Sequence, residues 1–170
     1  MNYYPSCWVD YINIELRTKF KSKEEAKNNL SLKDYKLLKD KYRNSTFKET
    51  LPINHDAFNL LQELKSRNFK ILIATSRPIE DPYYKNLRTL TKNWLNNNNI
   101  PYDEIIYKDK ELSFLKNRQI DFAIEDEIEY AKLMATKNVK VFLYMHNNVS
   151  PISLNNVVAV NDLSSILNYL

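Results

Sequence analysis

The chain has 170 residues, which is enough for one domain with a sizeable core and a small insertion. It contains no glycine, which excludes the glycine-rich phosphate loops of P-loop and dinucleotide-binding proteins. One cysteine excludes an internal disulfide, and no apolar run approaches the roughly 18 residues of a membrane span. We therefore expect a cytoplasmic protein without a membrane partner.

The net charge of +4 is weak evidence for nucleic-acid binding. The basic excess lies in the first 70 residues, and no aromatic stacking motif accompanies it. A solvated lysine face explains the charge without a polyanionic partner. A basic nucleic-acid-binding domain is the third of three interpretations of the function; the other two are given at the end of this subsection.

Residues 7–47 show helical periodicity. In a first helix the apolar side chains recur every four residues, at Trp8, Ile12, Leu16 and Phe20. Ser31 is the candidate N-cap of a second helix. The apolar face of that helix consists of Leu32, Tyr35, Leu38 and Tyr42. We assign residues 1–53 to a small helical cap or insertion.

From residue 54 onward, helical and strand patterns alternate. Five strands are predicted, at 69–75, 104–108, 120–126, 139–144 and 156–160. Helices are predicted before, between and after them, starting after Asn54, at 83–96, at 111–117, through Ile128, Ala131 and Met134, and at 162–170. This order predicts an α/β fold in which residues 54–170 form a parallel sheet covered on both faces.

Polar and charged residues directly follow three of these strands. They are Thr75, Ser76 and Arg77 after the first, Lys108 and Lys110 after the second, and Glu125 and Asp126 after the third. Ligands of open α/β sheets bind at the carboxyl ends of the strands, so these side chains are expected to converge. Carboxylates suit Mg²⁺, whereas hydroxyl, ammonium and guanidinium groups suit a phosphoryl group. Each residue also has a local explanation, since acids favour helix N-termini and threonine is common in turns.

The order of these groups adds information beyond their types. The stretches "FKILIATSRP", "NIPYDEIIYKDK", "IDFAIEDE" and "VKVFLY" resemble motifs two to four of the haloacid dehalogenase-like superfamily. Within it they are most similar to the nucleotidase branch that includes the 5'(3')-deoxyribonucleotidases. The resemblance covers residues 54–165 well and the helical cap loosely. It implies a Rossmann-like parallel sheet with a small helical cap.

The resemblance also implies a role for each residue at the strand ends. Thr75 looks like the hydroxyl that binds the transferring phosphoryl group, and Lys110 like the lysine that neutralises phosphate charge, with Lys108 as a close rival. Asp126 looks like the Mg²⁺ ligand, with Glu125 as its acidic neighbour. The remaining two residues, Ser76 and Arg77, are expected on the substrate side.

The sequence departs from this family in one respect. Members begin with an apolar strand that ends in Asp-x-Asp, which supplies the nucleophile and the general acid–base group. No Asp-x-Asp occurs here, and the central strand of the sheet is expected to be missing with it. Either the natural protein is longer and active, or the chain is a short form that has lost hydrolysis.

The expected function is therefore a Mg²⁺-dependent phosphomonoester hydrolase of the nucleotidase type. Its expected substrate is a nucleoside monophosphate or a similar small phosphate, and these 170 residues are expected to be catalytically incomplete. The alternative is a non-catalytic binding or regulatory protein on the same fold. The sheet edges beside a missing strand are open to pairing with another chain, so a homodimer is possible, and the sequence leaves the oligomeric state open.

Overall fold

The computed structural model describes residues 5–81, 84–107, 109, 111–145 and 154–170. The protein is α/β and divides into two compact units. The α/β unit contains His55–Ser76 and Pro101–Leu170, and the helical unit contains Asn2–Asn54 and Arg77–Ile100. The segment 77–100, which the sequence places with the α/β part, thus packs with the helical residues.

The helical unit consists of short helices from two separate parts of the chain. They are α1 (Pro5–Leu16), α2 (Lys23–Asn29), α3 (Leu32–Asn44), the 3-10 helix η1 (Thr46–Thr50) and α5 (Leu87–Asn97). The predicted N-cap of α3 is confirmed, because the Ser31 hydroxyl accepts the Asp34 N–H at 3.1 Å. The predicted first helix was too long, since Arg17 has left-handed backbone (φ 54°) and α1 ends before Phe20.

A small core holds the first three helices together. It is formed by the buried residues Ile12, Ala26 and Leu38, with Trp8, Phe20, Leu30 and Tyr35 packed around them. Leu32, predicted on the apolar face of α3, is instead 80% exposed. Helix α2 was not predicted, because its sequence is polar and contributes only Ala26 to this core.

The α/β unit alternates strands with helices, as the sequence predicts. Its elements are α4 (His55–Ser66), β1 (Leu72–Thr75), β2 (Glu104–Tyr107), η3 (Ser113–Asn117), β3 (Phe122–Glu125), α6 (Ile128–Thr136), β4 (Lys140–Tyr144), β5 (Val157–Val160) and η4 (Ser164–Tyr169). Two of the predicted helices, η3 and η4, are 3-10 helices. All strand pairings are parallel, which confirms that prediction.

The strands form two separate sheets rather than the single sheet that was predicted. One has the order β1-β2 and the other β3-β4-β5. Among the described strands, β1 therefore has a single neighbour, and so does β3. Both strands nevertheless pack on one core, because Ile73 of β1 and Ile124 of β3 contact the same buried cluster.

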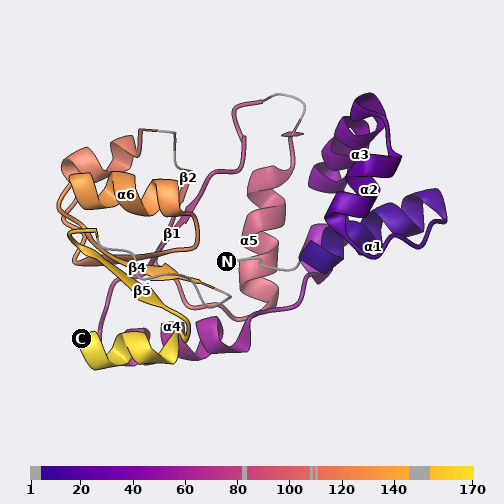
Figure 1. The fold of residues 1–170 in the computed structure, drawn as a ribbon. Helices are drawn as coiled ribbons and strands as arrows, with labels where there is room; N and C mark the ends of the chain where they lie inside the picture. The colour runs from indigo at the N-terminus through magenta and orange to yellow at the C-terminus, as the bar shows by residue number, and fades with distance from the viewer. Residues whose placement is uncertain (1–4, 82–83, 108, 110, 146–153) are drawn as a thin grey trace. The chain divides into compact units, whose positions relative to one another are not determined.

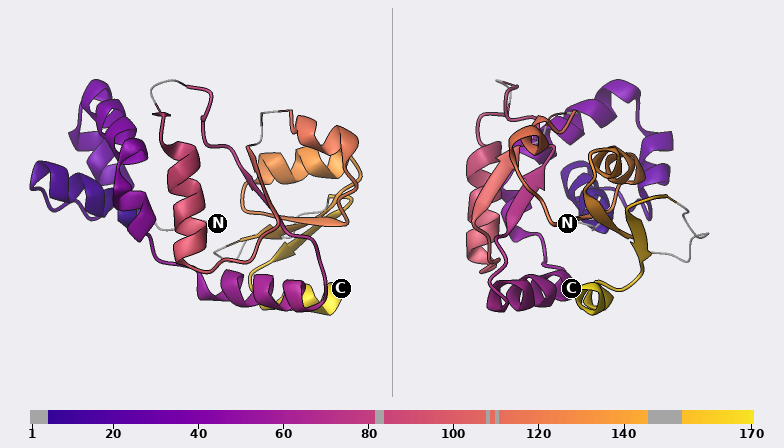
Figure 2. Two further views of the ribbon diagram at one scale, coloured as in Figure 1. Left: turned by 180° about the vertical axis from the view of Figure 1, so that it is seen from behind. Right: turned by 90° about the vertical axis from the view of Figure 1, so that its left-hand side faces the viewer.

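The three-stranded sheet is covered on both faces. Phe142 of β4 points to a cluster with Leu60 and Leu64 of α4, whereas Val141 and Leu143 point to a second cluster. That second cluster includes Ala131 and Met134 of α6 and the fully buried Leu112. Figure 1 shows α6 on one side of the sheet and α4 on the other, and both views of Figure 2 show α4 beside η4.

Asparagine ends three helices in the absence of glycine. Asn68, Asn99 and Asn138 follow α4, α5 and α6 with left-handed φ values of 64°, 51° and 61°. After α6, the Asn138 and Val139 N–H groups donate to Ala135 and Met134 carbonyls at 3.0 and 3.2 Å. This is the bonding of a glycine C-cap, and asparagine is the residue that tolerates that conformation next best.

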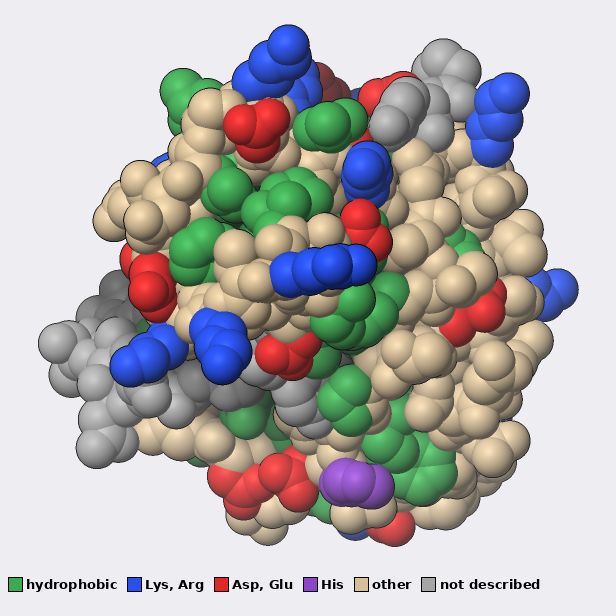
Figure 3. All heavy atoms as spheres, turned by 90° about the vertical axis from the view of Figure 1, so that its right-hand side faces the viewer, with side chains coloured by type: hydrophobic (Ala, Val, Ile, Leu, Met, Phe, Trp, Pro, Cys, Tyr) green, Lys and Arg blue, Asp and Glu red, His purple; other side chains and the backbone are tan. Residues whose placement is uncertain are grey.

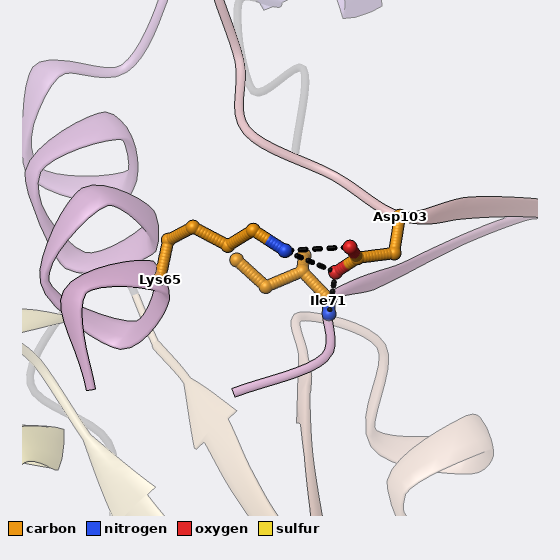
Figure 4. A network of polar contacts seen from close by, with 3 residues as sticks. All are labelled: Lys65, Ile71 and Asp103. Atoms are coloured by element: carbon orange, nitrogen blue, oxygen red, sulfur yellow. Dashed lines mark hydrogen bonds and ion pairs between the residues drawn. The ribbon is translucent and has the colours of Figure 1, made fainter. Parts of the chain in front are cut away.

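A polar network fixes the start of the two-stranded sheet (Figure 4). Lys65 Nζ of α4 lies 2.5 and 2.7 Å from the two carboxylate oxygens of Asp103. The same carboxylate accepts the Ile71 N–H at 2.7 Å. The Lys65 hydrogen bond, followed by the Ile71 N–H, holds the pKa of Asp103 below its usual value. Asp103 thus ties α4 to the first residues of both strands.

Candidate functional site

Thr75 and Ser76 lie at the carboxyl end of β1. Thr75 is the last residue of the strand and lies opposite Tyr107, the last residue of β2. It is half-buried, and Ser76 is exposed. Within the described residues no side chain hydrogen-bonds to the Thr75 hydroxyl, which leaves this group available to a ligand at the strand end.

Glu125 and Asp126 lie at the carboxyl end of β3, where α6 begins. The carboxylate of Glu125 is buried (9% exposed) and accepts the N–H groups of Asp126 and Glu127 at 3.1 and 3.4 Å. These bonds give Glu125 a local structural role at the start of α6. Asp126 is exposed and makes no ion pair with a described residue, so its carboxylate is the more accessible of the two.

The segment that leads into β1 contacts the first residue of β3. Phe69, which precedes β1, and Phe122, the first residue of β3, contact edge to face with ring centres 5.6 Å apart. Both strands are four residues long, and both pack on the same core. Thr75 and Glu125 are the residues at their far ends.

The loop after β2 is held in place by Asp109. Its carboxylate accepts the N–H groups of Glu111 and Ser113 at 3.1 and 2.9 Å, which keeps the pKa of Asp109 below its usual value. The adjacent Leu112 is fully buried with a left-handed backbone (φ 54°). The two candidate phosphate lysines of this loop, Lys108 and Lys110, lie outside the described residues.

Arg77 belongs to the helical unit, unlike Thr75 and Ser76. Its Nη1 donates to Thr91 Oγ1 of α5 at 2.5 Å. Thr91 is buried and donates in turn to the Leu87 carbonyl at 2.6 Å. The structure thus anchors Arg77 on α5, a contact that the sequence does not predict.

A second group of polar residues in the helical unit was also missed. Lys48 of η1 lies 4.9 Å over the ring of Tyr42, and burial followed by the charges of Arg77 and Arg43 lowers its pKa to about 8. Burial is also the main cause that raises the pKa of Tyr42 to about 12. The sequence signal was slight, because the segment "KYRNSTFKE" resembles any other basic stretch of this chain.

The described residues contain no group of three His, Cys, Asp or Glu side chains arranged to hold a metal ion. Mg²⁺ does not require such a group, because it is commonly bound by one or two carboxylates together with water and substrate phosphate. Glu125 and Asp126 fit that smaller requirement. None of the described helices is long and apolar enough to cross a membrane.

On the face drawn in Figure 3, the Lys and Arg side chains are interspersed with Asp and Glu rather than gathered in one basic patch. No family model matches the sequence, and no curated protein matches it.

Proposed function

We propose that the α/β unit is a Rossmann-like, haloacid dehalogenase-like domain that binds Mg²⁺ and a small phosphate ester at the carboxyl ends of β1 and β3. By descent it is a phosphomonoester hydrolase of the nucleotidase type, with a nucleoside monophosphate or similar compound as its substrate. Thr75 and Ser76 hold phosphate oxygens, and Asp126 with Glu125 holds the metal ion. Lys110 or Lys108 supplies the positive charge.

The observation that carries this proposal is the placement of complementary groups after two strands that pack on one core. At the end of β1 lies a hydroxyl that has no hydrogen-bond partner among the described residues, and at the end of β3 an exposed carboxylate lies beside a buried one. Hydroxyl donors bind phosphate oxygens and carboxylates bind hard cations, so the two sets suit one Mg²⁺–phosphate ligand. Mg²⁺ would neutralise phosphate charge there.

The divided sheet also supports the proposal. The family resemblance implies a strand that is not among these 170 residues, and β1 and β3 each have one described neighbour. A further parallel strand between them would join the two sheets. In the family that the sequence resembles, this strand ends in an Asp-x-Asp motif, which the sequence lacks. The 170 residues are therefore expected to bind the phosphate ester without hydrolysing it.

A non-catalytic binding protein is the second candidate, and one observation favours it. The Glu125 carboxylate is already bonded to two backbone N–H groups, which is sufficient to explain its presence without a metal. In that case Asp126 is a surface residue at the start of α6. The two candidates differ in whether Mg²⁺ strengthens phosphate binding.

Thermal unfolding with and without Mg²⁺ tests the proposal. A nucleoside monophosphate is expected to raise Tm more in the presence of Mg²⁺ than in EDTA, because a bound ligand stabilises the folded state by mass action. Thr75→Val and Asp126→Asn each preserve side-chain shape and remove one ligand group. Both are expected to lose the Mg²⁺-dependent part of the shift.

The matched control is Asp121→Asn, because Asp121 is an exposed acid just before the opposite end of β3. It is expected to retain the full Mg²⁺-dependent shift. A shift of equal size in EDTA and in Mg²⁺, or one that survives Asp126→Asn, would contradict the proposed metal site.

A further inference from the structure

The helical unit brings together three cationic side chains from separate parts of the chain. Arg43 lies in the last turn of α3, Lys48 lies on η1, and Arg77 precedes α5. Arg77 and the η1 segment that carries Lys48 are both hydrogen-bonded to α5, through Thr91 and Asn93. Burial, followed by the charges of Arg77 and Arg43, lowers the pKa of Lys48. Like charges held together in this way repel each other, so the folded chain must fix their positions by other contacts.

Helix α5 provides these contacts. Trp94 Nε1 donates to the Leu51 carbonyl at 2.8 Å, and Asn93 Nδ2 donates to Glu49 Oε1 at 2.8 Å. Leu51 directly follows η1 and Glu49 lies within it, so these bonds fasten the element that carries Lys48. Arg77 is fastened to the same helix through Thr91.

The acidic groups of this neighbourhood have other partners. Asp40 lies 3.9 Å from Arg43 and accepts the Tyr84 hydroxyl, while Arg43 Nη1 donates to Tyr84 Oη at 3.0 Å. Glu49 accepts from Asn93. No described carboxylate lies within ion-pair distance of Lys48 Nζ. The contact that the structure records for this half-buried ammonium is the ring of Tyr42.

We propose that Lys48, together with Arg77 and Arg43, forms an anion site on the helical unit that binds a phosphate group, as free phosphate or in a phosphate monoester. Phosphate carries between one and two negative charges near neutral pH and accepts several hydrogen bonds, which matches ammonium and guanidinium donors. The bound anion places a negative charge next to Lys48, which has no carboxylate partner among the described residues. This site goes beyond the function proposed above, because it lies within the helical unit and needs no Mg²⁺.

Phosphate titration in EDTA tests this site separately from the Mg²⁺ site. Inorganic phosphate is expected to bind saturably to the 170-residue protein, and Lys48→Met is expected to weaken binding at least tenfold. Lys39→Met is the matched control, because Lys39 is exposed on α3. Asp121→Asn, which lies outside both proposed sites, is expected to leave this Mg²⁺-free binding unchanged. Because the titration contains no Mg²⁺ and the other test measures only the Mg²⁺-dependent part of the Tm shift, failure of either proposal can be recognised by itself.

The pH dependence separates a direct contact from a structural effect. Lys48→Arg keeps the charge and does not titrate in this range, so between pH 7 and pH 9 its affinity is expected to change only through the ionisation of the phosphate itself. The unchanged protein is expected to lose affinity over that range relative to Lys48→Arg, as the Lys48 ammonium loses its proton. Parallel titrations with inorganic phosphate and a nucleoside monophosphate show which form binds more tightly. Equal affinity of Lys48→Met and the unchanged protein, or no saturable binding in EDTA, would overturn the proposal.

Discussion

Replacement of Lys48 by methionine is expected to stabilise the protein at neutral pH, and the gain is expected to shrink in alkali. Lys48 is half-buried beside Arg77 and Arg43, and its pKa falls from 10.5 to about 8. This difference corresponds to roughly 3 kcal/mol against the charged form in the folded state. Methionine has a similar length and no charge, so it removes this cost and keeps the contact with Tyr42.

The sign of the pH effect follows from the lowered pKa. Below about pH 8 Lys48 is protonated in both the folded and the unfolded chain, so the folded protein carries the full free-energy penalty of the buried ammonium. Between about pH 8 and 10.5 Lys48 loses its proton in the folded chain but keeps it in the unfolded chain, and the penalty of the buried charge disappears. Proton linkage then gives the unchanged protein roughly 2 to 3 kcal/mol of stability from Lys48 between pH 7 and pH 10. Tyr42 stays neutral throughout, because its pKa is about 12.

Urea unfolding monitored by tryptophan fluorescence measures this effect. Both tryptophans, Trp8 and Trp94, belong to the helical unit, so their emission reports on the environment of Lys48. The difference in unfolding free energy between Lys48→Met and the unchanged protein is expected to be largest at pH 7 and to shrink by roughly 2 to 3 kcal/mol at pH 10. Lys39→Met should show no such trend. A difference that is constant with pH would refute the reasoning.

Two further predictions concern the α/β unit. Asn138→Ala is expected to cost about 1 kcal/mol, because alanine tolerates the left-handed conformation after α6 poorly, whereas Asn138→Gly should retain full stability in urea unfolding. A loss of equal size in both variants would contradict this explanation. Asp103→Asn keeps an acceptor for the Ile71 N–H but removes the ion pair with Lys65. Because the pKa of Asp103 lies below its usual 3.8, its charge stabilises the fold above that pH and the benefit disappears as pH falls through the lowered pKa. Urea unfolding should therefore show a deficit for Asp103→Asn at pH 7 that narrows near pH 3; a deficit that persists would exclude the ion pair as its cause.

The alternation of strands and helices was predictable because its signal is local. Runs such as Lys140–Tyr144 place Val141, Phe142 and Leu143 in succession, and all three are buried with helices on both faces. The Ser31 cap of α3 was likewise readable from one hydroxyl before an amphipathic stretch. In both cases the deciding contacts lie within a few residues of each other.

The pairing of the strands and the cationic cluster of Arg43, Lys48 and Arg77 could not be predicted from the sequence. An apolar run predicts a strand but not its neighbour, so the division between β1-β2 and β3-β4-β5 came from the structure. The contacts around Lys48 join residues up to about 40 positions apart, as Asn93 to Glu49 illustrates. No short motif encodes such a contact. The position of Arg77 after a strand predicts a residue on the substrate side, whereas in the structure its guanidinium is hydrogen-bonded to Thr91 of α5.

The most direct test of the proposed Mg²⁺–phosphate site is paramagnetic broadening by Mn²⁺, which favours the same carboxylate ligands as Mg²⁺. With phosphate present, the account predicts that a small amount of Mn²⁺ broadens the backbone amide signals of Thr75, Ser76 and residues 125–127 together. Asp126→Asn should abolish the broadening at both strand ends. Broadening confined to residues 125–127, or absent from both ends, would contradict a shared site at the ends of β1 and β3.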